Sequence, residues 1–157
     1  AKILAEVLGC GLSCDAHHVT APNRKGIKKA IEKALLASGI NVGDVDYISA
    51  HGTGTAHNDK EEAGAIKEVF GSKIPVSSIK SMLGHCMGAA SAIEAVTCCF
   101  AIRDGIMPPT INFSIPDPEC DIDCIPNHAR KAPVKVALNN AFAFGGNNCC
   151  VVFKEFS

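Results

Sequence analysis

The chain has 157 residues, of which 47% are hydrophobic and 20% are charged. This is enough apolar material for one packed core, and it predicts a single domain over residues 1–157. The formal net charge of −1 argues against a nucleic-acid partner, which would need a strongly basic face. Because no uninterrupted apolar run of about 20 residues is present, we expect no membrane-spanning helix.

The cysteine pattern argues against a secreted disulfide framework. The chain has nine cysteines, an odd number, and four of them form the adjacent pairs at 98–99 and 149–150. No C-x-x-C pair is present, so a zinc ribbon is not expected and we predict no metal site. We expect reduced, mostly buried cysteines that act as small hydrophobic residues in a cytoplasmic protein.

The first predicted elements are a strand and an amphipathic helix. The apolar run 2–12 predicts a strand. Residues 24–38 repeat apolar side chains at helical spacing, with Leu36 expected on the buried face. Asn23 is placed to start this helix, and Gly39 to end it.

The next elements surround two turns that contain histidine. Residues 45–50 predict a strand that ends at His51, and 58–70 predict a helix with Asn58 or Asp59 as its N-cap. Residues 75–79 predict a short buried strand. The segment 86–104 predicts a helix that carries small residues nearly all round, which favours a central, buried position.

The last third predicts a loop and a hairpin. Residues 105–133 contain six of the eight prolines and no periodicity, which indicates a long ordered loop. Residues 135–144 and 149–156 predict two antiparallel strands joined by residues 145–148. Strands that alternate with helices and end in a hairpin predict an α/β fold, a mixed sheet layered with helices.

Polar groups and glycines follow three of these predicted strands. His51 precedes two glycines that alternate with threonines, Lys80 precedes His85, and the third strand ends at Gly145 and Gly146. Ligands of open α/β sheets bind at the carboxyl ends of strands, so the three segments suggest one convergent site.

These segments carry a family resemblance. HGTGT followed by Asn58-Asp59, SxKSMLGHxxGAA over 78–90, AFAFGGNN over 141–148 and GLSCDAHHVTAP over 11–22 occur in this order along nearly the whole chain. Together they resemble the C-terminal half of a β-ketoacyl-[acyl carrier protein] synthase. The resemblance implies half of a thiolase-type fold and an acyltransferase activity in fatty-acid (lipid) or polyketide synthesis.

The resemblance implies a decarboxylative Claisen condensation of an acyl thioester with malonyl-[acyl carrier protein]. Such a reaction needs a cysteine that holds the acyl group and donors for the enolate oxygen that forms when CO2 leaves. His51 and His85 are the candidate donors. A helix start at His85 would disfavour its protonation and keep it neutral. Lys80 is a weaker catalytic candidate that orders the site or assists electrostatically.

The resemblance also implies how substrates are held. Thr53 and Thr55 resemble positions that hydrogen-bond the phosphopantetheine arm. Phe144 resembles a residue that gates the acyl pocket and offers its backbone N–H to the acyl oxyanion. No cofactor is expected, because phosphopantetheine arrives on the acyl carrier protein.

Four acidic residues have supporting roles in this interpretation. Asp59 and Glu62 match acidic positions near the active site of the family, although both also suit the first turn of a helix. Glu94 lies in a helix expected to be buried and needs a partner, for which Lys80 is the obvious candidate. Asp15 is expected to have a structural hydrogen-bonding role.

The basic residues of helix 24–38 allow two interpretations. A solvated helix face is the simpler one. Docking of a carrier protein stays open, because the carrier proteins of this family are acidic.

The nucleophile of the family is missing from the chain. No cysteine stands among small residues at a strand-to-helix elbow, and Cys86 beside His85 falls inside a predicted helix. The chain is therefore a fragment, one part of an enzyme split between two chains, or a protein that has lost elongation activity. The expected partners are an N-terminal half or a separate chain that carries the cysteine, and the family implies a dimer.

Two alternatives remain open. The chain could be a non-catalytic, chain-length-determining subunit of a heterodimeric ketosynthase, although such partners often lack the active-site histidines that are present here. A thiolase-like or sterol-type acyltransferase, using Cys149 or Cys150, is disfavoured by the HGTGT and KSMLGH motifs.

Overall fold

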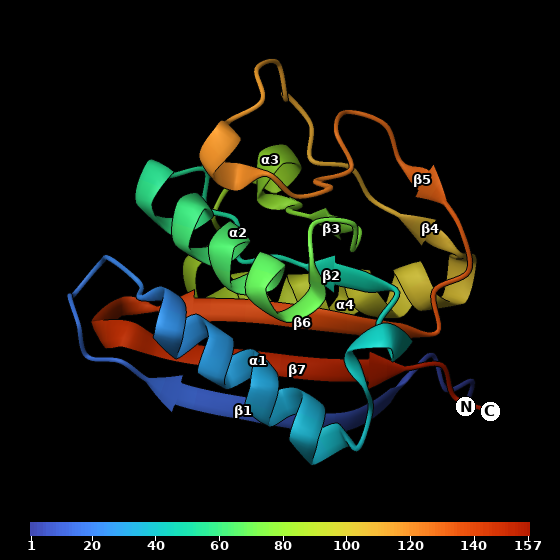
Figure 1. Ribbon diagram of the computed structural model, residues 1–157. Coiled ribbons are helices and arrows are strands. Elements are labelled where there is room, and N and C mark those ends of the chain that lie inside the picture. Colours follow the sequence, from blue (N-terminus) through green and yellow to red (C-terminus); the bar gives the residue numbers. More distant parts are fainter.

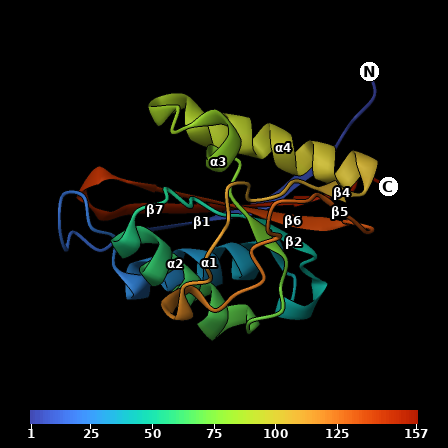
Figure 2. The ribbon, with the colours of Figure 1, turned by 90° about the horizontal axis from the view of Figure 1, so that it is seen from above.

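The computed structural model describes residues 1–157 as a five-stranded sheet with helices on both faces. Figure 1 looks onto one face of the sheet, and Figure 2 shows the sheet edge-on, with α1 and α2 on one face and α4 on the other. The main sheet consists of β1 (Glu6–Cys14), β2 (Tyr47–Ser49), β3 (Val76–Ser77), β6 (Val136–Ala143) and β7 (Asn147–Lys154). The helices are α1 (Arg24–Ser38), α2 (Ala56–Phe70), α3 (Lys80–Leu83) and α4 (Ala90–Asp104).

The shorter elements lie mostly in the connections. A separate two-stranded sheet is formed by β4 (Ile106–Met107) and β5 (Arg130–Lys131). The single 3-10 turns are η1 (Val42–Asp44), η2 (Met87–Ala89), η3 (Pro118–Cys120) and η4 (Phe144–Gly146).

The strand directions decide where the site lies. The order across the sheet is β1-β7-β6-β2-β3, with β2 parallel to β3 and β6, and β7 antiparallel to β1 and β6. It follows that β1, β2, β3 and β6 run in one direction, and their carboxyl ends share one edge of the sheet. The predicted mixed sheet layered with helices is confirmed.

The core lies on both faces of the sheet. On the side of α1 and α2, apolar side chains such as Ile31, Ile48 and Leu138 are fully buried, and Tyr47 and Cys98 are fully buried on the side of α4. Apolar burial of this kind supplies most of the stability of the fold.

The approach of α1 to β1 depends on glycine. A Cβ atom at Gly11 would lie 2.0 Å from the carbonyl oxygen of Ala30 and 2.4 Å from the backbone nitrogen of Ala34. Because glycine has no Cβ atom, the helix backbone rests directly on the strand.

Helix 24–38 is confirmed at both ends. The Asn23 side chain accepts a hydrogen bond from the backbone N–H of Lys25, and Gly39 closes the helix with a left-handed φ of 67°. The expectation for Leu36 was wrong, because its side chain is 83% exposed. It lies beyond the stripe of α1 that faces the sheet.

Long-range pairing moved several strand limits. The strand predicted over 2–12 runs from Glu6 to Cys14, because its last residue pairs with Asn147 of β7. The strand predicted over 75–79 keeps only two residues in β3. The predicted hairpin is confirmed, but its connection is Phe144–Gly146, and residues 147–148 belong to β7.

The predicted N-cap of α2 was wrong. The helix begins at Ala56, its N-cap is Thr55, and Asn58 and Asp59 lie inside the first turn. The Asn58 side chain donates instead to carboxylates of the same helix, which draws it inward.

The helix predicted over 86–104 was too long and too deeply placed. The α-helix begins at Ala90, and only one stripe of it is buried against the sheet, while Val96 and Phe100 are 50% and 43% exposed. Within these 157 residues only the sheet packs against α4. The helix is therefore buried on one side, although it carries small residues nearly all round. The proline-rich segment 105–133 is a loop as predicted, except for β4, β5 and η3.

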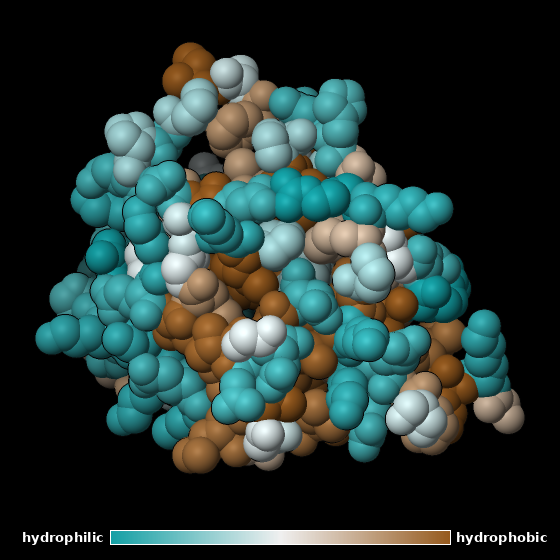
Figure 3. All heavy atoms as spheres, turned by 45° about the vertical axis from the view of Figure 1, so that its right-hand side comes forward, coloured by the Kyte–Doolittle hydropathy of each residue, from teal (hydrophilic) through white to brown (hydrophobic).

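The surface also corrects the expectation for cysteine. All nine thiols are free, but only Cys98 and Cys150 are buried, and Cys10, Cys14 and Cys86 are exposed. Figure 3 shows one face of the molecule, where hydrophobic side chains gather near the centre and along the lower edge among hydrophilic ones. None of the helices has the length and apolar character needed to cross a membrane. No three metal-binding side chains are grouped together.

A substitution tests the contact between α1 and β1. We expect Gly11→Ala to lower the free energy of unfolding by about 3 kcal/mol, because the added methyl group must push the α1 backbone away. The control Gly43→Ala adds a methyl group in open space and should change the value by less than about 0.5 kcal/mol. Urea unfolding of both variants measures this, and equal stabilities would contradict the close approach.

Candidate active site

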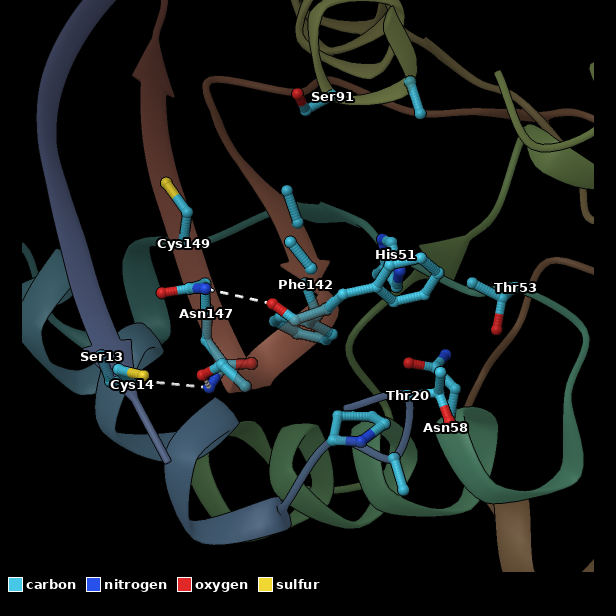
Figure 4. Close-up of a pocket in the computed structure, with 18 of the residues that line it drawn as sticks. Ser13, Cys14, Thr20, His51, Thr53, Asn58, Ser91, Phe142, Asn147 and Cys149 are labelled. Atoms are coloured by element: carbon cyan, nitrogen blue, oxygen red, sulfur yellow. Dashed lines mark hydrogen bonds between the residues drawn. The ribbon is translucent and has the colours of Figure 1, made fainter. Parts of the chain in front are cut away.

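A cavity of about 940 Å³ opens at the sheet edge where β1, β2 and β6 end. The loop after β1, the turn after β2, the segment that precedes α4 and the connection between β6 and β7 form its walls. Figure 4 shows His51, Phe142 and Thr53 on one side and Cys14 and Cys149 on the other.

The buried carboxylate of Glu62 holds the turn that follows β2. Its two oxygens accept the backbone N–H groups of His51 at 2.9 Å and Gly52 at 2.8 Å. The side-chain amides of Asn140, at 3.2 Å, and Asn58, at 3.4 Å, complete its partners. Burial raises the pKa of Glu62, and the two backbone hydrogen bonds oppose that shift. The contact therefore joins α2, β6 and the His51 turn.

Lys80 supports the same turn from the other side. Its ammonium donates to the backbone carbonyl of His51 at 2.5 Å and forms a buried ion pair with Glu94 of α4. The predicted pairing of Lys80 with Glu94 is confirmed. The Ser78 hydroxyl donates to the carbonyl of Gly52 at 2.7 Å. The backbone carbonyls of His51 and Gly52 are thus held by side chains from the segment after β3.

The two predicted histidines meet at the cavity. The ring centroids of His51 and His85 are 5.5 Å apart, with the rings nearly perpendicular at 84°. Only 8% of His51 is exposed, and its ring also lies 5.3 Å from the ring of Phe142. Burial, with the nearby charge of Lys80 and the neighbouring His85, lowers the pKa of His51 to about 3. This imidazole is therefore neutral at physiological pH.

His85 lies in a turn rather than at the start of a long helix. The α-helix begins five residues later at Ala90, which corrects the expected position. The backbone N–H of Met87 donates to Nδ1 of His85 at 3.2 Å, and Met87 has a left-handed φ of 50°. With Nδ1 acting as the acceptor, a neutral ring carries its proton on Nε2. The exposed imidazole can then donate a hydrogen bond from Nε2.

The Gly-Thr turn presents two hydroxyls beside the histidines. The hydroxyl oxygens of Thr53 and Thr55 are 2.9 Å apart, and both residues line the cavity. Asp59 accepts the backbone N–H of Gly54 at 3.3 Å, so it stabilises the turn from the first turn of α2. The predicted residues of this segment therefore lie at one site.

Phe144 stands at the opposite wall of the cavity. It is 63% exposed and is followed by Gly145, which has a left-handed φ of 78°. The Asn147 side chain donates to the carbonyl of Phe144 at 3.1 Å, which closes the short connection (Figure 4).

Asp15 connects that wall to the loop after β1. Its backbone N–H donates to the carbonyl of Gly146 at 3.0 Å, and its carboxylate accepts the side-chain amide of Asn148 at 2.9 Å and the backbone N–H of His17 at 3.0 Å. All three contacts are structural, which agrees with the expected role of Asp15.

Some residues of the site were not singled out in the sequence. Asn140 is fully buried in the middle of β6 and donates to Glu62, and Asn139 beside it donates to the carbonyl of Ser91 at 2.9 Å. Two consecutive asparagines in an otherwise apolar strand were the available signal, because buried polar side chains need partners.

The cysteines near the cavity do not supply an evident nucleophile. Cys14 and Cys149 line it, whereas Cys86, adjacent to His85 in sequence, does not. Burial raises the pKa of the Cys149 thiol, which disfavours the thiolate that would be the nucleophile.

The low pKa of His51 predicts a pH-dependent stability. The unfolded chain protonates this side chain near pH 6.5, whereas the folded chain resists protonation down to about pH 3. Between these values the unfolded state binds more protons, so stability is lost as the pH falls from about 6.5 towards 3. The contribution of His51 down to pH 4 is on the order of 3 kcal/mol.

Urea unfolding of the wild type and of His51→Asn between pH 7 and pH 4 measures this contribution. The variant should lose less stability on acidification, because it lacks the group that must be kept neutral. Parallel losses in the two proteins would show that His51 is not held neutral by the fold.

Comparison with known proteins identifies the family. The family described as "Beta-ketoacyl synthase, C-terminal domain" matches residues 4–114. The chain is 51% identical over 158 residues to "Nodulation protein E" of Rhizobium meliloti, and the aligned residues cover 99% of this chain and 39% of that protein. It is 47% identical over 161 residues to "3-oxoacyl-[acyl-carrier-protein] synthase 2" of Synechocystis sp., again covering 99% and 39% of the two chains.

Solved structures agree in fold. "The ishigamide ketosynthase/chain length factor" superposes with a TM-score of 0.97 at 51% identity, over 100% of this chain and 39% of that one. A "type II PKS acyl-carrier protein in complex with its ketosynthase bound to the hexaketide" superposes with a TM-score of 0.96 at 40% identity, over 100% and 40%. The expected thiolase-type fold is confirmed, and the chain spans only 39% of the curated relatives cited above. The chain belongs to the β-ketoacyl synthase family and matches its C-terminal domain.

Proposed function

We propose that the protein catalyses decarboxylative condensation of an acyl thioester with a malonyl thioester carried by an acyl carrier protein, and that this chain supplies both histidine donors. The observation that carries the proposal is the pair of imidazoles at one cavity. Their ring centroids lie 5.5 Å apart. His51 has a lowered pKa, and His85 accepts a backbone N–H at Nδ1.

The chemistry follows from where charge develops. When the malonyl C–C bond to the carboxylate breaks, CO2 leaves, and the electron pair of that bond forms an enolate on the thioester. The enolate oxygen becomes negative and accepts hydrogen bonds from the N–H groups of His51 and His85. The enolate carbon then attacks the acyl thioester, and the cysteine thiolate leaves.

The remaining residues position these groups. Glu62 and Asp59 hold the backbone of the Gly-Thr turn, and Lys80 with Glu94 holds the carbonyl of His51. Each acts through the turn that carries His51, so we assign these four residues positioning roles.

Two segments would bind the substrates. Thr53 and Thr55 would hydrogen-bond the phosphopantetheine arm with their paired hydroxyls. Phe144, exposed on the connection after β6, would gate the acyl chain and offer its backbone N–H to the acyl oxyanion. The arm arrives on the carrier protein, so the proposal requires no resident cofactor.

The nucleophilic cysteine would come from outside these 157 residues. We assign residues 1–157 to a C-terminal synthase domain that packs against the part bearing this cysteine, in a dimeric enzyme. The outward face of α4 and the turn before it support this arrangement, because Met87 of η2 and Val96 and Phe100 of α4 expose 61%, 50% and 43% of their surface. Exposed apolar patches of this kind mark contact surfaces.

Removal of either histidine tests the assignment. We expect His51→Ala and His85→Ala each to slow the decarboxylation of a malonyl thioester about 100-fold or more, because one oxyanion donor is lost. Release of CO2 from a labelled malonyl thioester measures the rate. His128→Ala changes an exposed histidine that does not line the cavity, and it should leave the rate unchanged. Full activity in both active-site variants would rule out the proposed roles.

A labelling experiment finds the nucleophile. The protein purified from its natural source would be treated with a cysteine-directed inhibitor of condensing enzymes, and intact masses would be taken under native and denaturing conditions. Label on a longer polypeptide that contains this sequence, or on a second chain that co-purifies with it, would support the proposal. If no label is incorporated, neither this polypeptide nor a co-purifying chain carries a reactive nucleophilic cysteine. A non-catalytic subunit of a heterodimeric ketosynthase then becomes the better assignment.

A further inference from the structure

One buried side chain at the cavity has an oxygen without a hydrogen-bond partner. Asn58, in the first turn of α2, is 4% exposed, and its amide nitrogen Nδ2 donates to Asp59 at 3.0 Å and to Glu62 at 3.4 Å. Its carbonyl oxygen Oδ1 is buried and unpaired. Because buried polar atoms are nearly always hydrogen-bonded in folded proteins, an unpaired acceptor beside a cavity points to a role in binding.

The orientation of this carboxamide is fixed by its neighbours. Turning it over would place its oxygen against the carboxylates of Asp59 and Glu62, which accept hydrogen bonds and do not donate them. The amide nitrogen therefore faces the two carboxylates, and the oxygen faces away from them. Figure 4 shows the Asn58 side chain reaching from α2 toward the cavity, on the same side as Thr53.

Its place beside His51 separates Asn58 from the other unpaired oxygens. Among the residues that have a buried, unpaired side-chain oxygen, Asn58 and Asn148 are the two that line this cavity. Asn148 donates to Asp15, at the wall formed by the loop after β1. Asn58 instead shares the Glu62 carboxylate with the backbone N–H of His51. Its unpaired oxygen therefore belongs to the part of the site that carries a proposed enolate donor.

The chemistry of the arm that carries the thioester fits this oxygen. A pantetheine arm has two amide groups, and two methylene groups join the nearer one to the sulfur. Each amide presents a carbonyl that accepts a hydrogen bond and an N–H that donates one. The hydroxyls of Thr53 and Thr55, which line the same cavity, can donate to a carbonyl, whereas the amide N–H needs an acceptor. The Asn58 oxygen can only accept, so it complements the threonines.

We propose that Asn58 Oδ1 accepts the N–H of the amide nearest the thioester and thereby selects donors that carry an N–H at this position. This inference rests on the proposed function, to which it adds a specificity-determining residue. The carboxamide is already held by Asp59 and Glu62, so little side-chain freedom is lost when the arm binds. A site built to accept an N–H discriminates against an analogue that lacks it, because the buried acceptor is then left unpaired.

The test changes one group of the donor. The intact enzyme, including the part that carries the nucleophile, is given malonyl-pantetheine or an analogue in which an ester oxygen replaces the N–H of the near amide, and CO2 release is measured. We expect the kcat/KM of the wild type to be about 10-fold lower for the ester, because one hydrogen bond is lost and two oxygens face each other. In Asn58→Ala the two donors should differ by less than about 2-fold.

The ratio of the two donors separates recognition from a structural role. If Asn58 served only the fold, Asn58→Ala would slow both donors by the same factor and keep the wild-type ratio. Thr20→Ala is the matched control, because it also removes a polar side chain that lines the cavity, and the Thr20 hydroxyl lies 3.4 Å from Nδ1 of His18. This control should keep the preference for the amide. The wild-type comparison needs no variant, so it decides the matter even if Asn58→Ala does not fold.

Two outcomes would overturn the proposal. The wild type could use both donors equally well, or its preference for the amide could persist in Asn58→Ala. If the wild type releases CO2 from neither donor, the proposed function fails, and saturation-transfer NMR with pantetheine and its ester analogue tests the contact by binding alone. Equal binding of the two compounds would then reject the role of Asn58, whereas weaker binding of the ester to the wild type, but not to Asn58→Ala, would support it.

Discussion

The site depends on one buried carboxylate. Glu62 points from α2 into the sheet edge and accepts two consecutive backbone N–H groups from the turn that carries His51. Without it, the buried N–H of His51 would lose its partner at a cost of about 1–3 kcal/mol, and the partly buried N–H of Gly52 would lose its partner too. The carboxylate also accepts a hydrogen bond from the side-chain amide of Asn140 in β6, so a strand near the end of the chain helps to place a histidine in its first third. The geometry of the cavity is therefore set by a helix, a strand and a turn that meet at one side chain.

The positive charge of the site is balanced within the protein. Lys80 is buried, and its charge is balanced by Glu94 rather than by a substrate. Its ammonium donates a hydrogen bond to the backbone carbonyl of His51. The same positive charge, in addition to burial, lowers the pKa of the His51 ring. One ion pair thus stabilises the turn and helps to keep the imidazole neutral. That combination suits hydrogen-bond donation to an oxyanion better than it suits proton transfer.

Local sequence patterns predicted the parts of the fold that depend on interactions between residues close in the sequence. The periodicity and caps of α1, the strands β6 and β7, and the turn at His51 could all be recognised from the sequence alone. The one-sided burial of α4 could not, because a pattern of small residues does not tell how many layers will pack around it. The contact between Asn140 and Glu62 joins two segments that lie far apart in the sequence, which no window of sequence contains.

The hydrogen bond from the backbone N–H of Asp15 to the carbonyl of Gly146 limits how the cavity can be redesigned. A Cβ atom at Gly146 would lie 2.4 Å from the Asp15 carboxylate, and the residue also has a left-handed φ of 80°. Any side chain there would break the link between β1 and the connection after β6. The neighbouring Ala141 and Ala143 line the cavity without such a constraint. An engineer who wishes to change the shape of the cavity should therefore vary these alanines and leave the glycine untouched.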